Sequence, residues 1–74
     1  MKLHEKIKWL RENKELYQKD IAKILQTTQS YYAQYENGKR QIPNIHIRTL
    51  ALFYNVSADW LLDLPNNLPY PKRK

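Results

Sequence analysis

Apolar residues recur at spacings of three and four along most of the chain, which is the period of a helix that buries one face. Leu3, Ile7 and Leu10 form such a face and predict a first helix over about residues 2 to 13, with Lys2, Lys6 and Arg11 on its flanks. The alternating β-branched pattern that is typical of strands occurs nowhere in the sequence. The pattern therefore predicts an all-α fold.

Two more helices are predicted in the middle of the chain. The first covers about residues 18 to 25 and buries Ala22. The second begins after Thr28, whose hydroxyl can accept a hydrogen bond from a free backbone N–H of the first turn. It ends at Asn37-Gly38, because both residue types tolerate the left-handed backbone of a helix terminus.

The last two helices are marked by their start and stop signals. Pro43-Asn44 begins a fourth helix, which Asn55 can end, and Ser57 caps a fifth helix over about residues 57 to 62. One folded domain is thus expected over residues 1–64. Residues 65–74 contain three prolines and end in three basic residues, which predicts an extended or disordered basic tail.

Composition narrows the class of protein. A chain of 74 residues forms one small domain, and without cysteine it has no disulfide, thiolate nucleophile or cysteine zinc site. Thirteen Lys and Arg against seven Asp and Glu give a net charge of +6, which favours DNA, RNA or an anionic membrane as partner. We see neither a membrane-spanning segment nor a secretory signal, so a cytoplasmic location is expected.

Enzyme chemistry has little support in the sequence. A single glycine excludes a phosphate-binding loop, and His4 and His46 fall on separate helices without a carboxylate pattern around them. Both histidines are expected at the surface. We therefore predict no catalytic residue, metal, cofactor or small-molecule substrate.

Residues 18–37 carry the functional pattern, which is a short helix, a turn and a second short helix. Ala22 is small enough for the two helices to pack at a steep angle, which leaves the second one exposed. Such a helix fits the major groove of DNA. Tyr32 and Tyr35 raise the possibility of base stacking on RNA, but their spacing places them on the inner face.

A specific set of residues extends this pattern across most of the chain: Ile7, Leu10, Arg11, Gln18, Ile21-Ala22, residues 28–36, Asn37-Gly38-Lys39-Arg40 and residues 56–62. In this order and spacing they resemble the Cro/C1-type (Xre-like) helix-turn-helix family, which includes the repressors of lambdoid phages. The resemblance covers about residues 3 to 62. It implies a compact five-helix bundle, the lambda repressor-like DNA-binding domain.

The resemblance also implies roles for individual residues. The positions that look toward base edges are Gln29, Ser30, Tyr31 and Gln34, and those expected to contact the DNA backbone are Gln18, Thr28, Asn37, Lys39 and Arg40. Arg11 and Glu36 are expected to form a partly buried salt bridge between the first and third helices. The alternative is that these are ordinary exposed polar residues.

Three positions depart from the family pattern. Glu15 and Gln26 stand where glycine is usual, so a left-handed backbone there would cost about 1 kcal/mol each. Tyr17 replaces the usual Ser or Thr cap of the second helix, which leaves backbone donors to water or to Gln18. These departures concern loop geometry and leave the DNA-contacting positions in place.

The sequence thus predicts a transcriptional regulator, in particular a repressor, that reads double-stranded DNA with residues 28–37. A homodimer on DNA is implied by the resemblance, with Trp60, Leu64 and Leu68 as candidate interface residues, although Trp60 also suits the core. The main alternative is a protein-interaction module of the same fold, such as an antitoxin or a phage adaptor. An amphipathic membrane helix is a weaker alternative, because the core needs the apolar residues.

Overall fold

The computed structural model describes residues 1–64, which form helices connected by short turns, with no strand in this range. The helices are α1 (Leu3–Asn13), α2 (Gln18–Ile24), α3 (Gln29–Glu36), α4 (Asn44–Tyr54) and α5 (Ala58–Leu61). The all-α, five-helix prediction is confirmed, with ends that agree to within one residue. The predicted tail over residues 65–74 lies outside the described residues.

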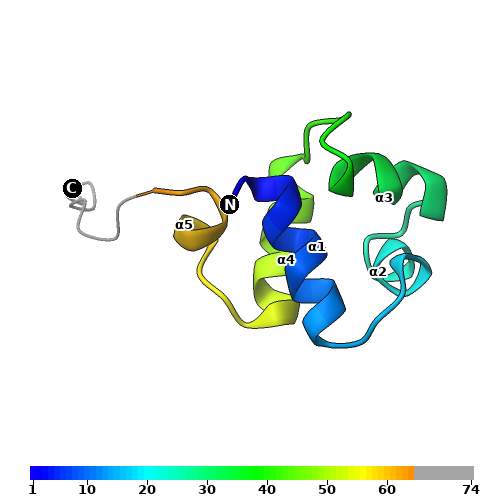
Figure 1. Cartoon of the computed structure of the whole chain (residues 1–74), viewed down its shortest axis with the longest axis horizontal. Helices are drawn as coiled ribbons and strands as arrows, with labels where there is room; N and C mark the ends of the chain where they lie inside the picture. The colour runs from blue at the N-terminus through cyan, green and yellow to red at the C-terminus, as the bar shows by residue number, and fades with distance from the viewer. Residues whose placement is uncertain (65–74) are drawn as a thin grey trace, which may run out of the picture.

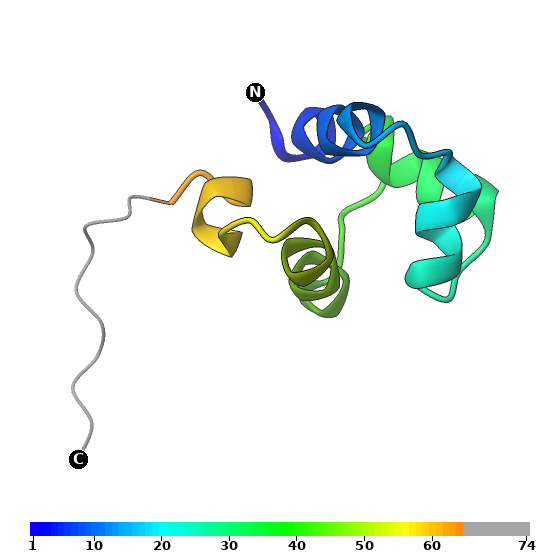
Figure 2. The same cartoon turned by 90° about the horizontal axis from the view of Figure 1, so that it is seen from below.

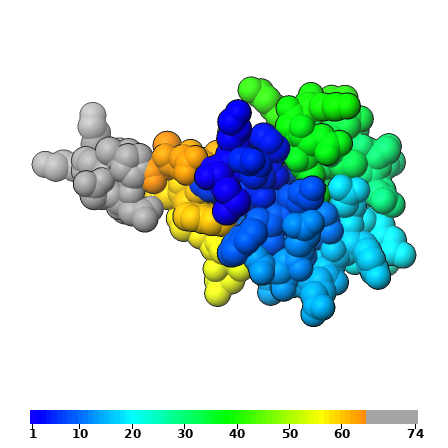
Figure 3. Space-filling model, in the orientation of Figure 1, coloured from blue at the N-terminus to red at the C-terminus, as the bar shows by residue number. Residues whose placement is uncertain are grey.

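The helices are arranged with the helix-turn-helix at one end of the domain. Figures 1 and 2 show α2 and α3 together at one end, α5 at the other, and α1 and α4 between them. The space-filling view shows α2 and α3 beside α1, at the right-hand edge of the molecule (Figure 3). The two motif helices therefore lie together at one end of the domain.

One hydrophobic core joins all five helices. It contains Ile7, Leu10, Ile21, Ala22, Leu25, Tyr32, Tyr35, Ile42, Ile47, Leu50, Ala51, Tyr54 and Leu61. Ala22 is 1% exposed and lies where α2 packs on α3, as its small size predicts. Tyr32 and Tyr35 are fully buried, so these two rings support the fold and are not free to stack on bases.

Local hydrogen bonds define the ends of the helices. The Thr28 hydroxyl accepts a hydrogen bond from the Tyr31 N–H at 3.1 Å, and the Ser57 hydroxyl accepts one from the Asp59 N–H at 3.0 Å. At the start of α2 the Asp20 carboxylate, and not Gln18, accepts from the Tyr17 N–H at 2.8 Å. An acidic side chain in the first turn thus partly replaces the missing hydroxyl cap.

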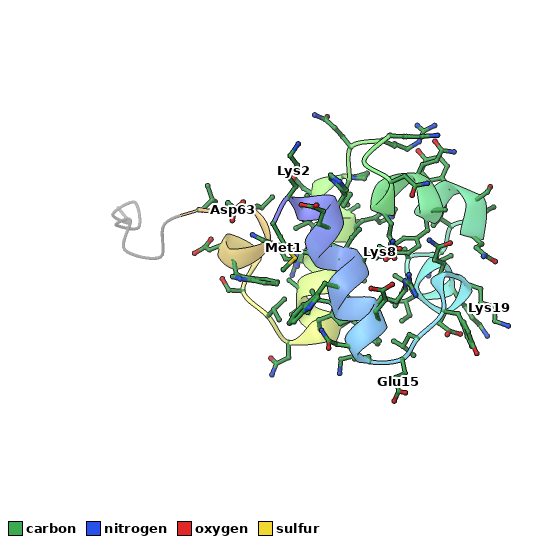
Figure 4. All side chains as sticks on the ribbon, viewed as in Figure 1. Met1, Lys2, Lys8, Glu15, Lys19 and Asp63 are labelled. Carbon is green, nitrogen blue, oxygen red and sulfur yellow. The ribbon has the colours of Figure 1, made fainter. Side chains whose placement is uncertain are left out.

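The two turns that lack the usual glycine keep a left-handed backbone. Glu15 between α1 and α2 has φ 56°, and Gln26 between α2 and α3 has φ 57°. Both side chains are exposed, and Figure 4 shows Glu15 pointing away from the body of the protein. The turns therefore have glycine-like geometry and carry a cost of about 1 kcal/mol each.

Lys6, which the sequence places on the flank of the first helix, is buried. Its side chain is enclosed between α1 and α5, where Nζ donates to the Trp60 carbonyl and to Asp63 Oδ1, the latter at 2.6 Å. Nζ also lies 4.9 Å from the centre of the Trp60 ring. Trp60 itself remains 36% exposed, so it is only partly a core residue.

The histidines are less exposed than expected. His4 is half-buried, and its ring covers Gly38 at the end of α3. His46 is half-buried because its Nδ1 is hydrogen-bonded to the Tyr35 hydroxyl at 3.0 Å. Both histidines therefore connect other elements to the α3 region, and neither is a free surface group.

Candidate nucleic-acid interface

The N-terminal part of α3 presents the predicted base-contacting residues to solvent. The side chains of Gln29, Ser30 and Tyr31 are exposed, whereas Gln34 is half-buried one turn further along. The opposite face of α3 is held by the buried Tyr32 and Tyr35. A helix anchored on one face and open on the other is suited to lie against a second macromolecule.

The basic connection that follows α3 is fully exposed. Asn37, Lys39 and Arg40 all reach solvent, and Gly38 between them has φ 73°, a left-handed conformation that glycine adopts at little cost. The Lys39 N–H donates to the Gln34 carbonyl at 3.0 Å, which closes the end of the helix. Two cations are thus held directly beside the open face of α3.

A shallow concavity lies between the starts of α2 and α3. It is lined by Arg11, Tyr17, Gln18, Lys19 and Gln29. Lys19 is exposed on α2, where Figure 4 places it at the outer edge of the motif, 5.5 Å from the centre of the Tyr17 ring. Lys19 was not among the residues predicted from the sequence, although its position next to Gln18 at the start of α2 offered the signal.

Arg11 and Glu36 pair across the interface of α1 and α3. Arg11 Nε and Nη2 donate to the two oxygens of Glu36 at 2.7 and 3.0 Å, and Arg11 Nη1 donates to the Leu16 carbonyl at 2.8 Å. Gln18 Nε2 donates to Glu36 Oε1 at 3.1 Å. The Gln18 side chain is therefore tied to this ion pair in the free protein.

The electrostatics of Glu36 follow from these bonds. Burial alone acts to raise the pKa of Glu36, but hydrogen bonds from Arg11 and Gln18 outweigh it and hold that pKa below its ordinary value. The hydrogen bond to Glu36 in turn raises the pKa of Arg11. Both groups stay charged, and the last turn of α3 is fixed to α1.

Two tyrosines connect the exposed face of α3 to the core. The Tyr31 ring packs edge-on against Tyr35, with ring centroids 5.6 Å apart and an interplanar angle of 87°. The Arg40 guanidinium lies 4.4 Å from the centre of the Tyr31 ring, and Arg40 Nε donates to Gln34 Oε1 at 3.2 Å. Predicted base-contacting and backbone-contacting residues thus touch one another before any ligand is bound.

No group of three or more His, Cys, Asp or Glu side chains within residues 1–64 is placed to hold a metal ion. No described helix is long and apolar enough to cross a membrane. The four predicted base-contacting residues lie together on the open face of α3.

This geometry defines a class of protein, the helix-turn-helix proteins of the lambda repressor type, in which a second motif helix stands exposed on a small helical bundle. The sequence matches the family described as "Helix-turn-helix domain" over residues 4–67, and the protein belongs to that family. No curated protein matches the sequence.

A solved structure has a fold similar to that of this protein. The chain is similar to the P22 c2 repressor protein, determined in complex with the synthetic operator 9T in the presence of Tl+. The TM-score is 0.76 and the identity is 19%, over 84% of this chain and 94% of the repressor chain. The predicted lambda repressor-like fold is therefore confirmed, while the roles of individual residues stay predictions.

Proposed function

We propose that this protein binds double-stranded DNA sequence-specifically and regulates transcription, as a repressor, with α3 in the major groove. The observation that carries the proposal is the open N-terminal face of α3, where Gln29 and Ser30 project from a helix that the core holds rigidly. The P22 c2 repressor, which shares the fold, is an operator-binding protein by its own description.

In this proposal the site residues are of two kinds, those that contact base edges and those that contact the DNA backbone. Gln29 and Gln34 read base edges, and Gln29 is suited to a bidentate pair with adenine worth about 1 to 3 kcal/mol of discrimination. Ser30 and Tyr31 lie beside them and contact bases or a thymine methyl group. The predicted contacts to the DNA backbone come from Gln18, Thr28, Asn37, Lys39 and Arg40, and Lys19 joins them from the edge of the concavity.

The proposed protein acts as a homodimer on DNA, so that two copies of α3 meet successive major grooves of a palindromic site. Leu64 is 48% exposed and Trp60 is 36% exposed at the end of the domain away from α3, which supports them as interface candidates. Leu68 lies outside the described residues. Sedimentation with and without a selected duplex tests this, and one copy per palindromic site at saturation contradicts it.

Selection from randomised duplexes, followed by fluorescence anisotropy over a range of salt concentrations, tests the DNA proposal. Gln29→Ala is expected to relax preference at one base position, and Lys39→Ala to weaken all sequences alike and reduce the salt slope by about 1. Arg48→Ala is the matched control, because Arg48 is an exposed cation on the groove between α4 and α5.

The outcomes separate DNA binding from its main alternative. No enrichment of any sequence, together with identical salt slopes for Lys39→Ala and Arg48→Ala, contradicts the proposal. Such a result favours a protein-interaction module, in which the exposed face of α3 contacts another protein. The cytoplasmic location belongs to the proposal and is tested by fractionating cells that express the protein.

A further inference from the structure

We infer that Arg40 is a positioning residue that fixes the orientation of the Gln34 side-chain amide and thereby sets which base edge Gln34 reads. This inference deepens the proposed function and rests on it. It starts from a cluster of three side chains, Tyr31, Gln34 and Arg40, in which the arginine contacts both of the others.

The cluster is built outward from the core. Tyr35 is 1% exposed, and its ring supports Tyr31 edge-on at 5.6 Å. Tyr31 and Gln34 are three residues apart and lie on the same face of α3. The Arg40 guanidinium lies over the Tyr31 ring at 4.4 Å and reaches Gln34 Oε1 with Nε at 3.2 Å. Tyr35 therefore supports Tyr31, Tyr31 supports the Arg40 guanidinium, and Arg40 contacts Gln34.

The chemistry of the two polar groups decides which way the amide turns. A glutamine amide carries an acceptor oxygen and a donor nitrogen and can rotate to present either one, whereas arginine has only donors. Arg40 therefore selects the orientation with Oε1 turned toward the guanidinium. The Gln34 Nε2 donors are left to face the ligand.

A glutamine held in this way prefers an acceptor on the base it meets. Purine N7 and the carbonyl oxygens of guanine and thymine are acceptors in the major groove, whereas the cytosine amine is a donor that would oppose the Nε2 donors. The bound orientation exists before DNA arrives, so its entropy is not lost on binding. We assign to Gln34 a preference for an acceptor edge and rejection of cytosine.

Arginine is required for this role, and lysine is not equivalent. The planar guanidinium stacks on a ring while donating through Nε, but an ammonium is a mobile point charge with neither property. Arg40→Lys therefore keeps the positive charge and removes the positioning. Arg48→Lys is the matched conservative change at an exposed arginine on the groove between α4 and α5, outside the cluster and outside the proposed DNA contacts.

The experiment compares base selection by wild type, Gln34→Ala, Arg40→Lys, the double variant and Arg48→Lys. Arg40→Lys is expected to relax the same base position as Gln34→Ala, by about threefold to tenfold, the value of one hydrogen bond. The double variant relaxes it no further than Gln34→Ala alone, and Arg48→Lys leaves it unchanged. Full retention of the preference in Arg40→Lys, or independent losses that multiply in the double variant, overturns the inference.

A measurement without DNA separates this inference from the proposed function. Nuclear magnetic resonance of the free protein is expected to show Arg40 side-chain protons shifted upfield by the Tyr31 ring, with the shift lost in Tyr31→Ala and kept in Tyr31→Phe. Unshifted Arg40 protons overturn the inference even where DNA binding is intact. Absence of sequence selection by wild type, with the ring shift present, overturns the proposed function and the reading role of Gln34 with it.

Discussion

Arg11 and Glu36 form a two-pronged ion pair, with Nε 2.7 Å from Oε2 and Nη2 3.0 Å from Oε1, that fixes the last turn of α3 to α1. The Glu36 side chain is 1% exposed and that of Arg11 is 12% exposed, so water does little to screen the pair. The orientation of the exposed helix thus depends on a contact at its far end from Gln29.

Removal of one member of this pair strands the other charge. Arg11→Ala and Glu36→Ala are each expected to lower the free energy of unfolding by about 3 to 5 kcal/mol, as for other buried pairs. The double variant is expected to lose clearly less than the sum, because it leaves no stranded charge. Urea denaturation of the three variants measures this, and additive losses would reject the coupling.

The lowered pKa of Glu36 predicts that the stability of the protein changes in acid. Its folded pKa lies below the ordinary value, so the unfolded chain binds more protons as the pH falls and stability decreases in that direction. The stabilisation is complete above the unfolded pKa of about 4.3 and is lost as the pH falls through the lower folded value.

Thermal melts of wild type and Glu36→Gln from neutral pH downward check this prediction. The variant is less stable at neutral pH, because Arg11 loses its charged partner, and its melting temperature is expected to fall less as the pH is lowered. Curves that stay parallel throughout the acid range would show that other carboxylates cause the acid sensitivity.

Glycine at the two left-handed turn positions is expected to stabilise the protein. Glu15→Gly and Gln26→Gly remove a steric cost of about 1 kcal/mol each at φ 56° and φ 57°, and the added chain entropy of glycine offsets roughly half of that gain. Asn55→Gly is the matched control, since Asn55 has φ 56° but asparagine tolerates this conformation. Denaturant midpoints should rise for the first two variants and change least for Asn55→Gly; a larger gain at Asn55 would argue against strain as the cause.

The raised pKa of Tyr54 predicts that the protein loses stability in alkali. Burial raises the pKa of Tyr54 to about 12, and its hydroxyl oxygen has no hydrogen-bond partner among the described residues. The unfolded chain then loses its phenolic proton from about pH 10, while the folded protein keeps it, so stability falls as the pH rises between these values. Tyr54→Phe is expected to be about as stable as wild type at neutral pH and to lose less in alkali. Melts of both proteins over this range test it, and an equal decline would assign the effect to other groups.

The helices were predictable from sequence because their signals are local. Periodic apolar residues and the caps at Thr28 and Ser57 act within one or two turns of a helix. The spacing of Tyr32 and Tyr35 is equally local, and it correctly predicted that both rings are buried. The open face of α3 followed from the same periodicity, and the roles of its polar residues came from the family resemblance.

The long-range contacts were not predictable in the same way. Lys6 meets Asp63 only because α5 packs against α1, and before folding a lysine beside an apolar stripe is equally compatible with a solvated position. Arg40 was expected to contact phosphate, and its contact with Gln34 depends on the path of the loop after Gly38. Such pairs depend on tertiary geometry, which spacing along the chain does not encode.

The contact between Gly38 and His4 sets a constraint on how this protein can diverge. A methyl group added at residue 38 would lie 3.1 Å from the His4 imidazole, and φ 73° is unfavourable for any residue with a side chain. A homologue with a larger residue at position 38 would therefore need a smaller one at position 4. These two positions are expected to covary. The loop that carries Lys39 and Arg40 is therefore positioned in part by His4 in the first turn of α1.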